Sequence, residues 1–392
     1  MRKILGVAAL AAAISLAASA QAQVIISGND EKSDFNDAGQ LVVKPPGKDT
    51  ISIIDVSNAG KPRITATLQV ANSVVGPPTN IAVTPNQKLA IVADSLDAVQ
   101  DGDKWKIAPA DKVFVVDLTA KPPKLINTLQ VGKQPSGVAI NRAGTLALVS
   151  NRAENSVSVL TISGNDVKVA GKVALAPDGS PNQMVSAIAI TPDGKRALAA
   201  MAAGNKVALL DIDGSTVTYK GYAMNTGIFP YNVLITPDGK LGLVANNGNG
   251  GASDGQVDTL AVIDMEMNPP RVVDQVVVGD GLEGLAVSPN GRYIASAVLN
   301  GVGNVPKTAF FHHDRSYVAL LKINGKKVRK VSEFETGGLT EGVAFSPDSR
   351  YLYAGNFITN DITVMRVRGN KLTAAGSLKI DGHPASMSGS AP

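Results

Sequence analysis

Two glutamates occupy the same place in two copies of one short pattern, and their type and spacing suit chemistry. Glu283 stands in LEGLAVSPNG and Glu341 in TEGVAFSPDS, and His383 follows near the start of a last, partial copy. Carboxyl groups held close together push their pKa values apart, which equips one as an acid and the other as a base. We therefore interpret Glu283, Glu341 and His383 as a candidate catalytic arc for hydrolysis. One Glu or His383 would activate a water, and Arg152 would hold an anionic group.

The same arc admits two other interpretations. Two carboxylates and a histidine are ligands that divalent cations accept, so the second is a metal site. In the third, each glutamate accepts hydrogen bonds from unpaired strand-end amides and faces a water-filled channel. The sequence does not choose among the three. The sequence predicts no cofactor, and a divalent cation would be bound only under the second interpretation.

A repeated unit must position these residues. Each copy is an apolar run, a turn that usually contains Pro with Asp or Asn, and a second apolar run. The copies follow one another at intervals of 45 to 58 residues, which is the period of a β-propeller blade and not of a helical solenoid. Six copies are visible, at 79–94, 136–151, 186–201, 231–247, 281–298 and 339–367.

Each unit is expected to form four strands, a to d. In the last full copy these are residues 342–346, 351–355, 362–367 and 375–380. The N-terminus supplies only the equivalents of strands b, c and d, at 24–27, 49–56 and 62–70, whereas residues 382–388 resemble the start of a strand a. Pairing the two ends makes a seventh blade. The prediction is an all-β, seven-bladed propeller of four-stranded antiparallel blades, closed by a C-terminal strand so that no sheet edge is left open.

Residues 1–22 are expected to be a secretory signal peptide. Arg2 and Lys3 precede an apolar stretch, and small residues at 18–22 form a cleavage site. The apolar stretch is short for a membrane anchor. We therefore predict one propeller domain over residues 23–392, located in the periplasm or secreted, with no membrane span after removal of the signal.

Composition excludes several classes of function. There is no cysteine, which rules out disulfides, thiolate catalysis and Cys-ligated zinc. The formal net charge is only +4, and no basic run is interleaved with aromatic residues, so we predict no nucleic-acid partner.

One mouth of the predicted channel is expected to carry the variable parts of the chain. The connections from strand b to strand c are long at 28–48, 95–110, 247–256 and 299–315, and long loops in a compact domain are usually functional. Candidate ligand-binding residues on this side, besides Arg152, are Trp105, Tyr231, Asn246, Phe310, Phe311, His312 and Asn356. The aromatic residues would either clamp a ligand or partner, or pack the loops onto the ring.

Two further patterns at this mouth are weak. His312 and His313 are adjacent, so on a strand they would point to opposite faces and would not share an ion. Asp97, Asp101 and Asp103 fall short of the spacing of a calcium loop, and a solvated acidic loop is the better interpretation.

The units resemble the YVTN-type β-propeller repeats of secreted bacterial proteins and, more loosely, the seven-bladed lactonase family. The resemblance covers roughly residues 24–390 and is carried by Ser/Thr-Pro-Asp/Asn turns starting at residues 84, 191, 236, 288 and 346, and by the Ala-Asn and Gly-Asn strand ends at 245–246 and 355–356. In the lactonase family, acidic, His and Arg residues at the central mouth are the functional ones. The motif indicates the fold and says little about chemistry.

Two functions are therefore expected. The first is an exported binding or interaction protein, a monomer, that holds a small-molecule ligand or an envelope protein at the loop-covered mouth. The alternative is a lactonase-like hydrolase that acts on a lactone or sugar acid at the same place.

Overall fold

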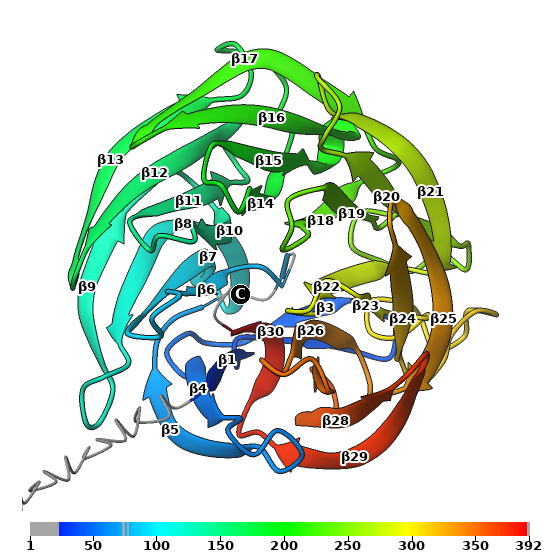
Figure 1. Ribbon diagram of the computed structural model, residues 1–392. Helices are drawn as coiled ribbons and strands as arrows, with labels where there is room; N and C mark the ends of the chain where they lie inside the picture. Colours follow the sequence, from blue (N-terminus) through cyan, green and yellow to red (C-terminus); the bar gives the residue numbers. More distant parts are fainter. Residues whose placement is uncertain (1–22, 73–74, 77, 390–392) are drawn as a thin grey trace, which may run out of the picture.

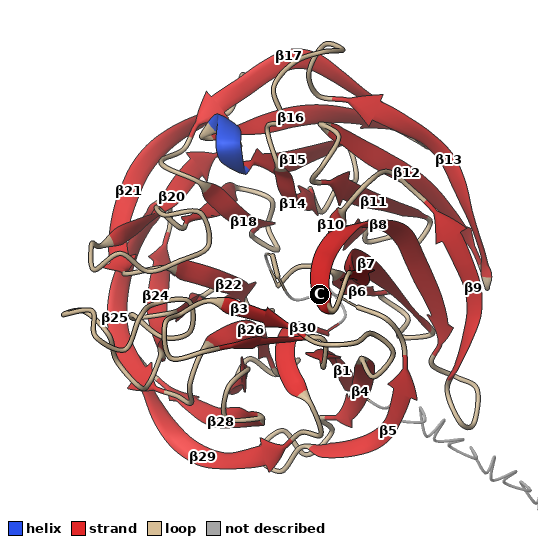
Figure 2. Cartoon of the chain, turned by 180° about the vertical axis from the view of Figure 1, so that it is seen from behind, coloured by secondary structure: helices blue, strands red, loops and turns tan. Residues whose placement is uncertain are grey.

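The computed structural model describes residues 23–72, 75–76 and 78–389, so the predicted signal peptide lies outside the described residues. Seven four-stranded antiparallel sheets surround a central channel, which confirms the predicted propeller (Figure 1). Figure 2 shows strands and loops with one short helical segment, the 3-10 helix Ala202–Gly204. Among the described residues, no helix has the length and apolar character needed to cross a membrane.

We number the blades in chain order, with the closure blade last. Blade 1 consists of β6 (Ile81–Val83), β7 (Leu89–Asp101), β8 (Lys104–Asp117) and β9 (Lys124–Gln130), and blade 2 of β10 (Pro135–Ile140), β11 (Leu146–Asn151), β12 (Ser156–Ser163) and β13 (Asp166–Ala174). Blade 3 consists of β14 (Val185–Ile190), β15 (Arg196–Met201), β16 (Lys206–Asp213) and β17 (Thr216–Asn225), and blade 4 of β18 (Pro230–Ile235), β19 (Leu241–Asn246), β20 (Asp258–Asp264) and β21 (Arg271–Gly279). Blade 5 consists of β22 (Leu282–Val287), β23 (Tyr293–Val298), β24 (Tyr317–Asn324) and β25 (Lys327–Glu335), and blade 6 of β26 (Thr340–Phe345), β27 (Tyr351–Asn356), β28 (Asp361–Arg368) and β29 (Lys371–Lys379).

Blade 7 closes the ring as predicted. Its strands are β30 (His383–Gly389), β1 (Val24–Asp30), β4 (Thr50–Asp55) and β5 (Arg63–Gln69), in that order across the sheet. Ile26 pairs with Ser388 on one side and with Ile53 on the other, so the C-terminal strand is hydrogen-bonded directly to the N-terminal one. A strand edge that would otherwise be open is thereby paired.

Glycine allows the innermost strands to approach one another near the channel. A Cβ on Gly284 would collide with the carbonyl oxygen of Glu341 in the next blade, and one on Gly342 would lie 2.5 Å from the backbone nitrogen of Met387 in blade 7. Each of these glycines directly follows one of the two candidate glutamates. The close approach that only glycine permits therefore also brings the two glutamates near each other.

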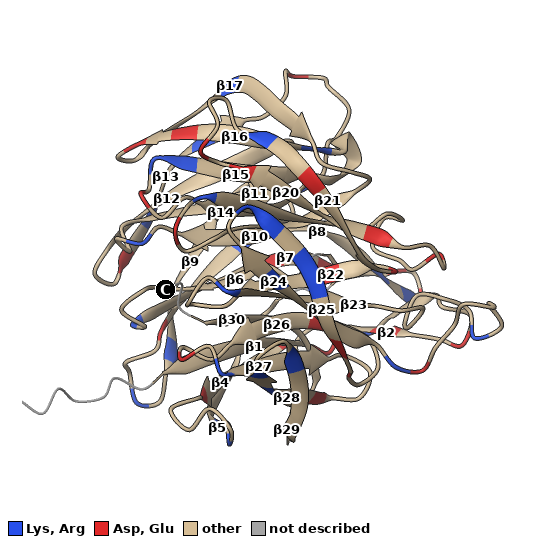
Figure 3. Cartoon of the chain, turned by 45° about the vertical axis from the view of Figure 1, so that its right-hand side comes forward, with Lys and Arg blue, Asp and Glu red and all other residues tan. Residues whose placement is uncertain are grey.

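The blades are held together by aliphatic residues between their sheets. The interface of blades 4 and 5 is typical, with Leu243, Leu260, Ile294 and Leu321 buried in one cluster. Burying such a side chain contributes roughly 1.5–3 kcal/mol. In the view of Figure 3, acidic and basic residues are interspersed over the outer strands and loops, as expected for a surface that contacts water.

The predicted turn chemistry is present. In the turn between β18 and β19, the Thr236 hydroxyl donates to Asp238 Oδ1 at 2.6 Å, and the same oxygen accepts from the backbone N–H of Lys240 at 3.1 Å. Asp residues at the ends of the c strands cap the following turn in three blades, where Asp55, Asp117 and Asp264 accept a backbone N–H two residues later. Asp211, at the same position of blade 3, forms an ion pair with Lys220, and Asp55 and Asp264 likewise pair with Arg63 and Lys326.

Two of the four predicted loops contain strands, which corrects the prediction for 95–110 and 28–48. In the first, β7 and β8 continue to a tight turn at Gly102, whose φ is +60°. The Asp101-Gly102 pair is a hairpin signal, so the extension could have been foreseen. In the second, β1 ends at Asp30, and the hairpin of β2 (Ser33–Phe35) and β3 (Leu41–Val43) follows.

The β2–β3 hairpin lies over the ring. Its tip meets the 299–315 loop, where the backbone N–H of Lys307 donates to the carbonyl of Asp37 at 3.0 Å. Phe35 at the end of β2 packs edge-on against Phe357, with ring centroids 6.1 Å apart. The b–c connections of blades 5 and 7 thus form a joint cover over the loop-side mouth of the channel, which we call the roof.

Candidate functional site

Glu283 and Glu341 are the second residues of the innermost strands of blades 5 and 6. Both are buried, with 4% and 8% of their surface exposed. The charge of Glu341 raises the pKa of Glu283, after the larger effect of burial, so the two carboxyls act on each other across the blade boundary. The predicted proximity of this pair is therefore present in the structure.

The surroundings favour the protonated form of both carboxyls. Burial is the main cause of the raised pKa of Glu341, and the charge of Asp30 in blade 7 adds to it. For Glu283, the positive charge of Arg152 opposes the increase but does not cancel it, and its pKa lies well above the ordinary range. A protonated carboxyl donates one hydrogen bond, so each of these groups can be a donor as well as an acceptor.

Tyr231 and Arg152 complete this cluster from blades 4 and 2. Tyr231 starts from the same position of strand a as the glutamates, is 4% exposed, and has a pKa raised first by burial and then by Glu283. Arg152 directly follows β11, and its guanidinium carbon lies 5.7 Å from the Tyr231 ring centroid. We call Arg152, Tyr231, Glu283 and Glu341 the mouth cluster.

Three polar atoms of the mouth cluster have no hydrogen-bond partner among the described residues: Glu283 Oε2, Glu341 Oε2 and Arg152 Nε. The other oxygen of Glu283 accepts from Asn247 Nδ2 at 3.3 Å. Buried polar groups are nearly always satisfied, and exceptions concentrate where a ligand, an ion or a catalytic role accounts for them. The mouth cluster therefore has hydrogen-bond donors and acceptors that are not satisfied by the described residues.

Loops of blades 4 and 5 enclose the mouth cluster. Asn247 Oδ1 accepts from the backbone N–H of Gly251 at 2.6 Å, and Asn304 Nδ2 donates to the carbonyl of Gly251 at 2.6 Å. The first bond lies within the 247–256 loop, and the second joins this loop to the 299–315 loop. On the far side, the backbone at Gly76 runs so close to Arg152 that a Cβ there would lie 3.0 Å from Nη1. The cluster is thus covered, and a ligand would reach it only by moving these loops.

His383 lies apart from the two glutamates in its contacts. Its ring stacks on Phe357 with centroids 4.5 Å apart and planes inclined by 19°, and Nδ1 lies 2.8 Å from the Phe357 carbonyl oxygen. The neighbouring Asp34 of β2 is partly buried, which opposes ionisation, but hydrogen bonds from Lys44 and from the backbone N–H of Phe35 lower its pKa. The third member of the predicted arc is therefore held against the base of the hairpin.

Asn246 and Asn356 make side-chain hydrogen bonds at the ends of strands β19 and β27. Asn246 Nδ2 donates to the Thr226 carbonyl at 2.8 Å and to Thr259 Oγ1 at 3.1 Å. Asn356 Nδ2 donates to Thr363 Oγ1 at 2.8 Å, and its oxygen accepts from the Thr340 hydroxyl at 2.6 Å. These side-chain bonds hold strand ends together, and Asn246 Oδ1 is left without a partner among the described residues.

The remaining candidates lie on the roof and on the extended hairpin of blade 1. Trp105 is half-buried in β8, opposite Gln100. Phe310 is 94% exposed and meets the half-buried Phe311 edge-on, with centroids 5.1 Å apart. His312 lies nearby, with Nε2 3.4 Å from Asp314 Oδ1. Phe310 is the one large side chain of this group that is fully presented to solvent.

A second buried ionic cluster was missed by the sequence analysis. Lys32, 5% exposed, donates to Asp49 and to the Asn72 carbonyl, and lies 3.6 Å from Asp30. We call Asp30, Lys32, Asp49 and Asn72 the closure cluster, because it joins β1 and β4 to the segment that leads into blade 1. The signal was the run of charged residues at 30–34, which falls where β1 ends.

No group of three or more His, Asp or Glu side chains in the described part of the chain is placed to hold a metal ion. At the extended hairpin, Asp101 forms an ion pair with Lys106 at 3.0 Å, and Asp97 is a strand residue paired with Ala108.

Comparison with known proteins supports the fold. A proposed 6-phosphogluconolactonase from Bacteroides fragilis matches with a TM-score of 0.71 at 16% identity, over 95% of this chain and 99% of that one. The periplasmic gluconolactonase of Pseudomonas aeruginosa matches with a TM-score of 0.65 at 16% identity, over 95% and 100%. The hydrazine synthase of Kuenenia stuttgartiensis matches with a TM-score of 0.59 at 20% identity, over 81% and 91%. No family model and no curated protein matches the chain.

Proposed function

We propose that this protein is an exported β-propeller of the YVTN-repeat type that binds a small hydroxylated ligand at the mouth cluster, beneath the roof. The observation that carries the proposal is the set of unpartnered polar atoms on Glu283, Glu341 and Arg152, which come from three different blades. Export to the periplasm or the medium rests on the sequence of residues 1–22. The protein acts as a monomer with no nucleic-acid partner.

The chemistry of the cluster defines the ligand class. Protonated carboxyls and the Tyr231 hydroxyl can each donate and accept, which suits the hydroxyl groups of a sugar-like molecule. Arg152 supplies a fixed positive charge for a carboxylate or another anionic group. A sugar acid or its lactone combines both features.

A thermal-shift experiment tests the proposal. D-gluconate and D-glucono-1,5-lactone are added to the wild-type protein, because binding to the native state raises the melting temperature by mass action. Two matched double variants accompany it. Glu283→Gln/Glu341→Gln keeps shape and hydrogen-bonding capacity, so the shift should persist. Glu283→Leu/Glu341→Leu removes that capacity, so the shift should disappear. A shift of equal size in the Leu variant, or none in the wild type, would contradict the proposal.

Hydrolysis of a lactone at the same cluster is the second candidate. It is favoured by the interaction between the two carboxyls, since burial and the charge of Glu341 raise the pKa of Glu283, and a carboxyl with a raised pKa can serve as a general acid. An assay that follows the opening of glucono-1,5-lactone through the release of protons distinguishes a hydrolase from a binding protein. A hydrolase loses turnover in the Gln variant while still binding, whereas a binding protein shows no enzymatic acceleration in either form.

An envelope protein is the alternative ligand of the roof. Phe310, 94% exposed, provides the aromatic anchor that such a contact needs. If neither sugar compound shifts the melting temperature, capture of a periplasmic partner that Phe310→Ala abolishes would support this alternative in place of the small ligand.

A further inference from the structure

The central channel contains a cavity that is separate from the mouth cluster. Its volume is about 290 Å³, and the innermost strands of all seven blades line it. Neither Glu283 nor Glu341 is among its lining residues. At one end it reaches the turns between strands a and b, where Arg142, Pro192, Pro237 and Pro289 border it. A volume of this size is at the lower end of the range of small-molecule sites.

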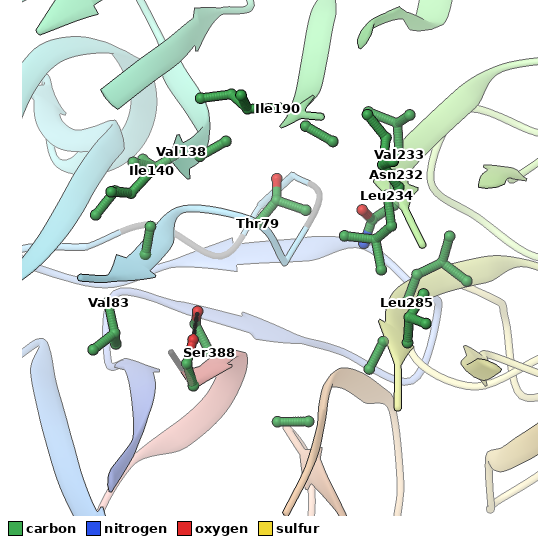
Figure 4. Close-up of a pocket in the computed structure, with 18 of the residues that line it drawn as sticks. Thr79, Val83, Val138, Ile140, Ile190, Asn232, Val233, Leu234, Leu285 and Ser388 are labelled. Carbon is green, nitrogen blue, oxygen red and sulfur yellow. Dashed lines mark hydrogen bonds between the residues drawn. The ribbon is translucent and has the colours of Figure 1, made fainter. Parts of the chain in front are cut away.

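The wall of this cavity is apolar. Aliphatic side chains from several blades surround the channel, as the close-up in Figure 4 shows for Val138 and Ile140 of blade 2 and for Val83, Ile190 and Leu285 of other blades. Polar side chains interrupt this wall at both ends, Thr79 and Asn232 toward the roof and Thr191 and Ser388 toward the turns. Several of these side chains, including Ile140 and Ile190, remain half-exposed within the folded protein. An apolar surface held open in this way gains free energy when a hydrocarbon replaces the water that contacts it.

A single charged residue lines this cavity among the described residues, and it stands at the outer end. Arg142 occupies the a–b turn of blade 2, where five other blades have Pro, and its side chain is exposed. The turns of blades 4 and 5 also carry a basic residue, Lys240 and Arg292, but neither of these lines the cavity. The site therefore combines an apolar interior with one positive charge at its rim.

We propose that the channel binds an amphipathic anion, a medium-chain alkyl carboxylate, with its hydrocarbon chain between the innermost strands and its carboxylate at Arg142. The chain enters from the turn side, opposite the roof. The apolar wall accounts for the alkyl part, and Arg142 at the rim accounts for the anionic head and for its orientation. This site does not depend on the mouth cluster or on the function proposed for it.

Calorimetric titration of the purified protein with hexanoate, octanoate and 1-octanol tests the proposal. Each buried methylene should tighten binding about fourfold, so octanoate should bind roughly 15 times more tightly than hexanoate. Absence of octanoate binding, or equal affinity for the two acids, would overturn the assignment.

Variants locate the two ends of the ligand. Arg142→Gln should weaken octanoate binding about 3- to 10-fold and leave 1-octanol binding unchanged, whereas Arg292→Gln, in the equivalent turn of blade 5, should change neither. Equal losses of octanoate affinity in both variants would overturn the role of Arg142.

Ile235→Trp fills part of the channel and should abolish binding of both octanoate and 1-octanol. Val287→Trp serves the same purpose if the first variant does not fold, and octanoate binding that survives in a folded Trp variant would place the site elsewhere.

Discussion

The closure cluster and the mouth cluster are neighbouring groups of buried charges that differ in how their charges are compensated. In the closure cluster, Lys32 lies between two carboxylates, and Asp30 also accepts from the Lys32 backbone N–H at 2.7 Å and from the Ser33 hydroxyl. In the mouth cluster, Glu283 and Glu341 each keep an oxygen without a partner. The two groups influence each other, since Asp30 helps to raise the pKa of Glu341.

This difference separates a structural role from a candidate functional one. A buried charge is tolerated when an opposite charge and hydrogen bonds compensate it, and such a pair fixes a specific arrangement of the chain. The charged groups of the closure cluster meet this condition where the ring must close, although burial raises the pKa of Asp30 and Asn72 Oδ1 has no hydrogen-bond partner among the described residues. The mouth cluster does not, and its carboxyls avoid the cost of burial by favouring the neutral form. A ligand bound beneath the roof could form hydrogen bonds with the unpartnered oxygens of Glu283 and Glu341.

The largest expected effect comes from breaking the closure cluster. Lys32→Met leaves two buried carboxylates without their cation and should lower the free energy of unfolding by about 3–5 kcal/mol. The matched control is Lys44→Met, which removes a partly exposed ion pair with Asp34 at 3.0 Å and should cost at most about 1 kcal/mol. Denaturant-induced unfolding measures both. If the two variants lose similar amounts of unfolding free energy, Lys32 contributes no more than a partly exposed ion pair.

The mouth cluster should make stability fall as pH rises. Glu283 and Glu341 have pKa values raised above the ordinary 4.5 of the unfolded chain, so the folded state binds more protons above that pH. Their contribution is fully present below pH 4.5 and is lost as pH rises toward the folded pKa, by up to about 1.4 kcal/mol per pH unit for each carboxyl.

Glu283→Gln/Glu341→Gln, which cannot ionise, should show a flatter dependence of the unfolding free energy between pH 5 and 8, and should exceed the wild type in stability at pH 8. Denaturation curves at several pH values provide the measurement. Parallel curves for wild type and variant would mean that these carboxyls are ionised and compensated, as in the closure cluster.

The smallest expected effect concerns the roof that joins the two clusters. Phe35→Ala removes the contact with Phe357 at the base of the hairpin and should cost about 2 kcal/mol, below the range for a fully buried Phe because Phe35 is half-buried. Limited proteolysis should then cut residues 36–40 faster. Phe310→Ala, at an exposed position of the same roof, should alter stability by no more than about 0.5 kcal/mol and leave the cleavage rate unchanged.

The sequence predicted the parts of this molecule that repeat. The strand order, the closure by residues 382–388 and the proximity of Glu283 to Glu341 all follow from one blade pattern, because equivalent positions in neighbouring blades lie side by side. His383 was grouped with the glutamates by the same logic, but its ring stacks on Phe357, a partner that the repeat does not specify.

Features that occur once were not predictable in this way. Lys32 meets Asp49 and Asn72 only after the two ends of the chain have closed the ring, and no periodicity links these positions. Whether the apolar channel wall encloses space depends on the tilt and spacing of seven strands, which the blade pattern does not specify. The prediction of a loop at 95–110 was an avoidable error, since Asp101-Gly102 is a turn signal.

The most direct test of the central claim is a crystal structure of the protein grown with whichever of D-gluconate and D-glucono-1,5-lactone raises the melting temperature more. We expect ligand oxygens at hydrogen-bonding distance, about 2.7–3.2 Å, from Glu283 Oε2, Glu341 Oε2 or the Arg152 guanidinium, with the 247–256 and 299–315 loops displaced from their present positions. A ligand bound away from these three residues, with the roof unchanged and the mouth cluster empty, would contradict the account.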